Sequence, residues 1–269
     1  MTHVQTAERG YVFDNDNPHS GEQHRCISTA YDLMTTERLA NTGVTDGWHC
    51  LDVGFGAGSI ARWLADRVAP TGSVLATDVK PGDVGSHPAL STAVHDITSD
   101  PLPEQHFDLI VVRLLLQHFP ERDAVLAKLV RALKPGGWLQ IDELDTSYEP
   151  VLLAPDDDSA RLYEKFLAAK KALMRSSGGD PQWGRRVARA MRAAGLVDID
   201  PRPCVRPRHA GSVDIGLQLH HTYHLRDGLL SVGMTDDELQ AVRAVMLHPS
   251  FRASSSVMYS VQGRKEQQQ

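Results

Sequence analysis

Short apolar runs alternate with amphipathic segments between residues 49 and 143 of this 269-residue chain. Two segments, 59–68 and 121–133, space their apolar residues as helices do. The runs have the length and apolar character of strands buried on both faces. They lie at 49–53, 73–77, 92–95, 107–112 and 138–143. This alternation predicts an α/β fold with a doubly wound, Rossmann-like and mostly parallel sheet.

Two later runs, at 197–200 and 255–263, bring the predicted sheet to seven strands. A helix is expected between them and the earlier strands, following the loop at 178–184 and ending at Ala194, with Gly195 just past its end. The Lys134-Pro-Gly-Gly137 segment is expected to end the helix before the fifth strand.

Three segments lie outside this alternation. We expect residues 1–45 to form an N-terminal helical cap, and residues 46–269 to form the core with cap insertions at 146–178 and 207–250. The first insertion carries a helical pattern near 158–175, and the second carries a capping box from Thr235 to Glu238. Ligands of open α/β sheets bind at the carboxyl ends of the strands, so these segments are expected to cover the site.

The first strand runs into a glycine loop and then directly into a helix. Asp52 is followed by Gly54, Gly56 and Gly58. This arrangement brings bare backbone N–H groups at a helix N-terminus up to a ligand. The dinucleotide fingerprint requires glycine at the first, third and sixth loop positions, whereas the sixth position here is Ser59.

Acidic residues end the next two strands. Asp78 follows the second strand, where a carboxylate can accept both hydroxyl protons of a ribose. Asp96 follows the third strand and is placed to accept from an adenine amino group. A ribose occurs in NAD and in S-adenosylmethionine alike, so Asp78 alone does not distinguish the two cofactors.

The spaced motifs together resemble class I S-adenosylmethionine-dependent methyltransferases. The pattern Asp-x-Gly-x-Gly-x-Gly at 52–58 resembles their first motif, and the runs 107–113 and 133–141 resemble their fourth-strand and fifth-strand motifs. The resemblance covers roughly residues 48–145 and is greatest to bacterial small-molecule enzymes of quinone-biosynthesis and natural-product type. It implies S-adenosylmethionine as the cofactor and S-adenosylhomocysteine as the product.

The resemblance also implies roles for single residues. Asp52 and the three glycines would face the methionine half of the cofactor and leave room for its ribose. Asp78 would bind the ribose hydroxyls, and Val79 would stack on the adenine.

The adenine edge and the amino-acid end would have partners of their own. Asp96 and the Ile97 N–H would read the adenine edge. Arg113, at the exit of the fourth strand, would lie by the amino-acid group of methionine. Arg113 departs from the small or polar residue often found there.

Methyl transfer from a sulfonium is an in-line displacement, in which orientation can supply about 7–11 kcal/mol. A base is needed only where the acceptor must lose a proton. His118, after the fourth strand, and Glu143, at the end of the fifth, are the candidates. The alternatives are that His118 caps a helix or packs beneath the cofactor, and that Glu143 anchors a loop.

The late insertion carries a histidine cluster, His220-His221-Thr-Tyr223-His224. On a helix these side chains would form a polar patch lining a substrate chamber, or an ordinary solvated face. No acid or cysteine is spaced to complete a metal site, so we predict no metal. Tyr11, before the first cap helix, is expected to close over the site as an aromatic N-terminal segment does in similar enzymes.

Composition narrows the partners. The net charge is −6, and the DNA amino-methyltransferase signature of an Asp, Asn or Ser followed by Pro-Pro-aromatic is absent after the fourth strand. Both disfavour nucleic acid as partner. The chain shows no signal pattern and no apolar run of about 20 residues, so we expect a cytoplasmic protein without a membrane partner. A small-molecule substrate and a monomer or homodimer are expected.

Three functions are compatible with these motifs. The first is methyl transfer to a small cyclic or aromatic metabolite of secondary or quinone-like metabolism. The second is a protein of the same fold that binds the cofactor but catalyses a cyclisation or rearrangement, or only binds and regulates. The third is an NAD-dependent dehydrogenase.

Overall fold

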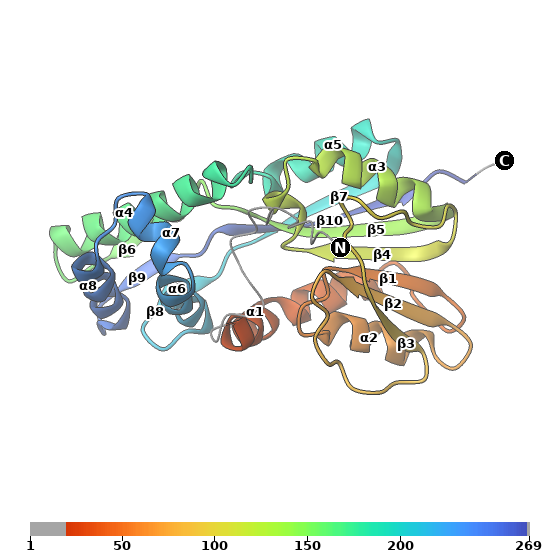
Figure 1. Cartoon of the computed structure of the whole chain (residues 1–269), viewed down its shortest axis with the longest axis horizontal. Helices are drawn as coiled ribbons and strands as arrows, with labels where there is room; N and C mark the ends of the chain where they lie inside the picture. The colour runs from red at the N-terminus through yellow and green to blue at the C-terminus, as the bar shows by residue number, and fades with distance from the viewer. Residues whose placement is uncertain (1–19, 268–269) are drawn as a thin grey trace, which may run out of the picture.

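A seven-stranded sheet forms the centre of the molecule (Figure 1), and the computed structural model describes residues 20–267 of the chain. The strand order is β3-β2-β1-β4-β5-β10-β7. The strands are β1 (His49–Val53), β2 (Ser73–Asp78), β3 (Leu90–Val94), β4 (Phe107–Arg113), β5 (Leu133–Asp145), β7 (Leu196–Cys204) and β10 (Val257–Lys265). The first five strands in this order, from β3 through β2, β1 and β4 to β5, pair in parallel. Strand β10 is antiparallel to both of its neighbours, β5 and β7. The predicted mostly parallel α/β fold is confirmed.

Helices cover both faces of the sheet and bury apolar side chains against it. Helix α2 (Ser59–Val68) buries five residues at helical spacing on one face, Leu64 among them without any exposed surface. Helix α1 (Ser20–Ala40) lies on the same side, and Leu39 joins the α2 core. Helices α3 (Arg122–Ala132) and α5 (Val187–Ala193) cover the opposite face. Complete burial of one leucine side chain contributes about 1.5–3 kcal/mol.

A second layer of structure lies beyond the carboxyl ends of the parallel strands (Figure 1, left). Helices α4 (Asp157–Ser176), α6 (Val213–His224), α7 (Arg226–Ser231) and α8 (Asp236–Leu247) surround their own apolar cluster. A small sheet of order β6-β9-β8 continues it, from β6 (Val151–Leu153), β9 (Arg252–Ser254) and β8 (Pro207–His209). In the chain, β6 follows β5, β9 precedes β10, and β8 follows β7. The order β6-β9-β8 of the small sheet therefore repeats the order β5-β10-β7 of the large sheet.

Several sequence boundaries were wrong in detail. The third strand lies at Leu90–Val94 rather than at 92–95, and the Lys134-Pro-Gly-Gly137 stop is part of β5, where a register shift against β4 absorbs it. The helix expected after residue 184 is divided into η2 (Gly184–Arg186) and α5. The small sheet was not predicted, because its strands have only three residues each.

The capping box at the start of α8 is confirmed, since the Glu238 backbone N–H donates to Thr235 Oγ1 and the Thr235 N–H donates to Glu238. None of the helices within residues 20–267 is long and apolar enough to cross a membrane.

Candidate active site

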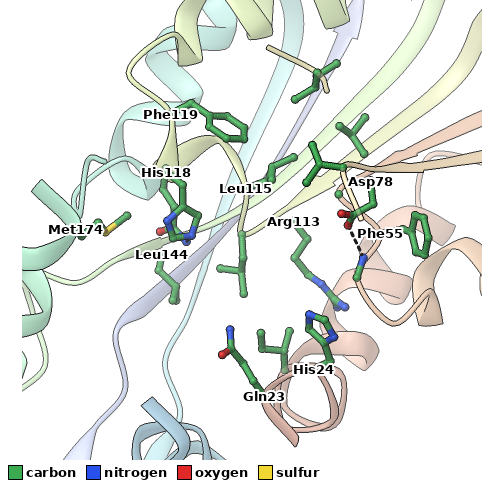
Figure 2. Close-up of a pocket in the computed structure, with 18 of the residues that line it drawn as sticks. Gln23, His24, Phe55, Asp78, Arg113, Leu115, His118, Phe119, Leu144 and Met174 are labelled. Atoms are coloured by element: carbon green, nitrogen blue, oxygen red, sulfur yellow. Dashed lines mark hydrogen bonds between the residues drawn. The ribbon is translucent and has the colours of Figure 1, made fainter. Parts of the chain in front are cut away.

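A cavity of about 520 Å³ lies at the carboxyl ends of β1, β2 and β4, a size typical of small-molecule sites. The strand ends and their loops line one side, and α1, α4 and α6 supply the rest of the wall. Figure 2 shows Asp78 and Phe55 at one end of the cavity, and His118 and Met174 at the other, with Arg113 between them. The cavity therefore lies at the strand ends, beneath helices from the three segments that stand outside the α/β alternation.

The glycine loop contributes backbone to this cavity. Gly54 and Gly56 line it, whereas Gly58 turns away as the N-cap of α2 with a left-handed φ of 78°. A Cβ at Gly58 would clash with Val84 Cγ1, so both the backbone angle and the close packing require glycine. The Gly56 N–H donates to Asp78 Oδ2 at 3.3 Å, the dashed line in Figure 2.

Asp52 is a polar group of the wall that indicates a bound ligand. Its side chain is buried, and its Oδ2 atom has no hydrogen-bond partner among the described residues. Burial raises the pKa of Asp52 to about 7, although the nearby Arg113 opposes this. A buried carboxylate oxygen without a partner is costly, and a ligand that donates a hydrogen bond would satisfy it.

The two acids at the ends of β2 and β3 hold their loops as well as lining the cavity. Asp78 Oδ1 accepts from the Lys80 N–H at 3.0 Å. Asp96 Oδ1 accepts from the Thr98 N–H and hydroxyl at 2.8 and 2.6 Å. Ile97 and the half-exposed Val79 also line the cavity, so all the predicted adenosine contacts are brought together there.

Arg113 leaves the end of β4 and connects the sheet to α1. Its Nη1 donates to Asp32 Oδ1 at 2.7 Å and to Thr35 Oγ1 at 3.5 Å. The Thr35 hydroxyl in turn donates to Asp142 Oδ2 on β5 at 2.6 Å. These contacts fix α1 over the strand ends, beside the glycine loop.

His118 ends the short η1 helix (Leu116–His118) and lines the cavity. Its Nε2 lies 3.4 Å from Gln117 Nε2. Burial, with a smaller effect of the Arg122 charge, lowers the pKa of His118 to about 4. The imidazole is therefore neutral at pH 7, which is the form that can accept a proton or a hydrogen bond.

Glu143 is fully buried, and the cavity wall does not include it. Its Oε1 accepts from the backbone N–H groups of Leu115, Leu116 and Gln117 at 3.1, 2.6 and 3.3 Å. Burial raises the pKa of Glu143 to about 8, against the three N–H donors that lower it. This is the loop-anchoring arrangement, and it fixes the segment that carries His118.

Of the predicted substrate residues within the described part of the chain, only one lies in the cavity wall. His221 of α6 lines the cavity, whereas His220 and Tyr223 do not. The ring of Tyr223 is half-exposed and lies 3.8 Å from the Arg243 guanidinium carbon. Among residues 20–267 no three metal-binding side chains come together. Tyr11 lies outside the described residues.

Many residues of the wall were not predicted, among them the polar side chains of Gln23, His24, Glu149 and Lys170. His24 approaches the glycine loop, because a Cβ at Gly56 would lie 3.4 Å from its Nε2. Burial lowers the pKa of His24, while the Asp78 charge raises it and that of Arg113 lowers it. Apolar residues do not form a clear stripe on α1, and this is the one sequence signal that α1 presents polar side chains such as Gln23 and His24 to the cavity.

Comparison with known proteins agrees with this geometry. The methyltransferase domain family matches residues 51–141. The C-methyltransferase UbiE of ubiquinone and menaquinone biosynthesis from Cupriavidus necator is 32% identical over 145 residues, which cover 51% of this chain and 57% of that protein. The UbiE protein of Ralstonia pickettii is 30% identical over 162 residues, covering 57% of this chain and 64% of that protein. The matches thus span less than two thirds of each relative.

Solved structures share the fold. The YcgJ protein of Bacillus subtilis superposes with a TM-score of 0.56 at 16% identity and covers 91% of this chain and 100% of its own. The cyclase SpnF has a TM-score of 0.50 at 18% identity, covering 88% of this chain and 81% of its own. The domain match, the relatives and the sheet topology agree with the motifs read from the sequence, and residues 51–141 form a methyltransferase domain of the class I S-adenosylmethionine-dependent type.

Proposed function

We propose that the protein transfers a methyl group from S-adenosylmethionine to a small acceptor held in the cavity between the strand ends and helices α1, α4 and α6. One observation carries the proposal. All the residues that the family resemblance assigns to the cofactor, except Gly58, line the same cavity as side chains of the two insertions. Donor and acceptor therefore have adjoining room in one enclosure. The division into a cap of residues 1–45, 146–178 and 207–250 over a core of 46–269 belongs to this proposal.

The wall fits the cofactor. The unpartnered Asp52 Oδ2 offers an acceptor to its ammonium or hydroxyl protons, and Asp78 lies next to the bare backbone of Gly56 for the ribose. Val79 presents an exposed apolar surface for adenine, with Asp96 and Ile97 at the adenine edge. When bound, the sulfonium supplies an electrophilic methyl carbon and a good leaving group.

The protein's own contribution is orientation. Glu143 anchors the backbone of 115–117, and this anchoring sets the position of His118 in the cavity wall. A neutral His118 imidazole can accept a hydrogen bond or a proton from an acceptor that must lose one, such as a phenol or an acidic carbon, and its lowered pKa makes it a weaker base than an ordinary histidine. Helix α1, held through Arg113 and Asp32, would limit the access of water.

The acceptor is proposed to be a small cyclic or aromatic metabolite of secondary or quinone-like metabolism. The wall beyond the strand ends is mostly apolar, with Leu115, Leu167, Leu173, Met174 and Leu217. Such a surface suits a ring system better than a nucleic acid. A cytoplasmic location and a monomeric or homodimeric state complete the proposal.

A cyclisation or rearrangement without methyl transfer is the second candidate, because the fold is shared with the cyclase SpnF. The test is to incubate the protein with methyl-labelled S-adenosylmethionine and a panel of phenols, quinols and enolisable ketones. Methyl transfer predicts one adenosylhomocysteine for each methylated product. A product formed without adenosylhomocysteine would support the cyclase class. Binding of NAD without binding of S-adenosylmethionine in calorimetry would overturn both.

A further inference from the structure

The wall of the cavity formed by the insertions carries amines as well as apolar side chains. Lys170 and Lys171 of α4 line it, one helical turn from Met174. Helix α4 lies in the left part of Figure 1, away from β2 and β3, which carry the proposed adenosine contacts. The lysines therefore lie toward the acceptor rather than toward the adenosine.

Glu149 is the carboxylate of this wall whose charge acts on Lys170, and one of its two oxygens already has partners. Glu149 Oε1 accepts from Arg208 Nη1 at 2.9 Å and from the Ser256 hydroxyl at 2.6 Å. Both side chains of the Glu149–Arg208 pair are only 4% exposed, so this is a buried ion pair in which the two opposite charges largely offset each other.

Lys170 itself has a neutral partner. Its Nζ donates to Gln218 Oε1 at 2.5 Å and lies 5.4 Å from the centre of the Phe166 ring. Within residues 20–267, no carboxylate oxygen lies within 4.0 Å of this nitrogen. An ammonium group in a mostly apolar wall, with no carboxylate in direct contact, favours an anionic ligand.

The electrostatics agree with this geometry. Burial lowers the pKa of Lys170 to about 7, while Glu149 raises it and Arg208 lowers it. A bound anion would stabilise the protonated amine and raise this pKa.

We propose that Lys170 binds a carboxylate group of the methyl acceptor, so that the acceptor is an apolar molecule with one acidic end. This inference rests on the proposed function and adds the chemical class of the substrate. The Lys170 ammonium can pair with one carboxylate group, whereas a phosphate dianion would be expected to require an arginine fork or several N–H donors.

The test uses calorimetry with saturating S-adenosylhomocysteine and two probes, 3-phenylpropanoate and 5-phenylpentanoate, each beside its neutral amide. At pH 6.5 the wild-type protein is expected to bind at least one acid about tenfold or more tightly than its amide. Lys170→Met should abolish this preference, and Lys170→Arg should retain it. Lys165→Met is the matched control, because Lys165 lies on the same helix and pairs with Glu238 at the surface.

The pH dependence gives a readout that needs no variant. The charged or titratable groups facing Lys170 are Glu149, Arg208, Lys171 and His221. Arg208 and neighbouring lysine charges lower the pKa of Glu149 against its burial, so Glu149 stays ionised. Burial holds the pKa of His221 well below its usual range, so His221 stays neutral. Acid binding to the wild-type protein should therefore weaken about tenfold between pH 6.5 and 8.5.

Asp52 also titrates in this window, on the cofactor side of the cavity. Comparison with Lys170→Met separates the two groups, because only the Lys170 contribution disappears in that variant. Amides that bind as tightly as their acids, or an acid preference that Lys170→Met retains, would overturn the proposal. So would tighter binding of phenyl phosphate than of the acids.

Binding of S-adenosylhomocysteine, measured in the same calorimetry, distinguishes a failure of this inference from a failure of the proposed function. If the wild-type protein binds no adenosylhomocysteine, the proposed function fails. If adenosylhomocysteine binds and neither acid is preferred over its amide, only the present inference fails. A loss of adenosylhomocysteine affinity of more than about threefold in Lys170→Met would mean that Lys170 holds the cofactor's own carboxylate, and would overturn the acceptor assignment.

Discussion

The Nη1 atom of Arg113 lies 2.7 Å from Oδ1 of Asp32, and the two residues are 81 positions apart in the chain. Arg113 ends a central parallel strand, and Asp32 lies in the middle of α1. The side chains are 13% and 30% exposed, so the pair is partly protected from solvent and from screening by salt. The N-terminal helix is thus fixed to the sheet at the edge of the proposed cofactor site.

Removing the charge of Asp32 should loosen α1 over the cavity. Asp32→Asn is expected to weaken adenosylhomocysteine binding about 3-fold to 10-fold, which is roughly 0.6–1.4 kcal/mol. Calorimetry measures this, and Glu37→Gln is the control because Glu37 is exposed on the same helix. Affinity within twofold of the wild type would mean that the pair does not contribute to cofactor binding.

Asp78 is expected to contribute more, because its carboxylate would accept hydrogen bonds from the ligand directly. Asp78→Asn should lower the affinity for adenosylhomocysteine at least about tenfold, or ~1.4 kcal/mol. The melting temperature without ligand should fall only slightly, since the amide oxygen can still accept from the Lys80 N–H, and the bond that is lost is the longer one from the Gly56 N–H, at 3.3 Å. Asp123→Asn on α3 is the control. Equal affinities of the two variants would refute the ribose assignment.

The sequence predicted the strands and the glycine loop well because local rules determine them. Residues 49–53 form a strand with the predicted bounds, and Gly58 occupies a backbone angle that disfavours other residues. The acids of the cofactor motifs lie at or within two residues of the carboxyl ends of β1, β2 and β3. Because these ends meet at one edge of the parallel sheet, the sheet topology alone brings Asp52, Asp78 and Asp96 together.

The rest of the site depends on long-range packing that no local pattern encodes. Lys170 resembles any other lysine of an amphipathic helix until α4 is placed against α6 and the Glu149–Arg208 pair. Similarly, Glu143 stands at a strand end as a catalytic acid would, and only the backbone of 115–117 shows what its carboxylate binds.

Glu143 therefore allows a test between anchoring and catalysis. Glu143→Gln retains an oxygen that can accept from the three N–H groups, so activity within about threefold of the wild type is expected. Glu143→Ala leaves those buried donors without a partner and should destabilise the fold by about 3 kcal/mol or more in urea denaturation. A hundredfold loss of kcat in a well-folded Glu143→Gln would instead assign a catalytic role.

The raised pKa of Glu143 has a consequence for stability that can be measured with the same variant. The folded carboxyl holds its proton up to about pH 8, whereas the unfolded one releases it near pH 4.5. The raised pKa of Glu143 therefore adds to the free energy of unfolding in full below pH 4.5, and this added stability is lost as the pH rises toward 8. The wild-type protein should therefore lose more stability than Glu143→Gln between pH 5 and 8.

His118 has the opposite dependence. The pKa of His118 is lowered from 6.5 to about 4 in the folded protein. Between these two pH values the unfolded chain binds a proton at His118 and the folded protein does not. Stability is lost as the pH falls from 6.5 toward 4. Between pH 7 and pH 5 the wild-type free energy of unfolding should fall about 1–2 kcal/mol more than that of His118→Gln. His209→Gln is the control, because His209 is exposed on β8 and should not alter the slope. Parallel slopes for wild type and His118→Gln would mean that the imidazole takes up its proton readily in the fold, and would remove the argument that a neutral His118 meets the acceptor.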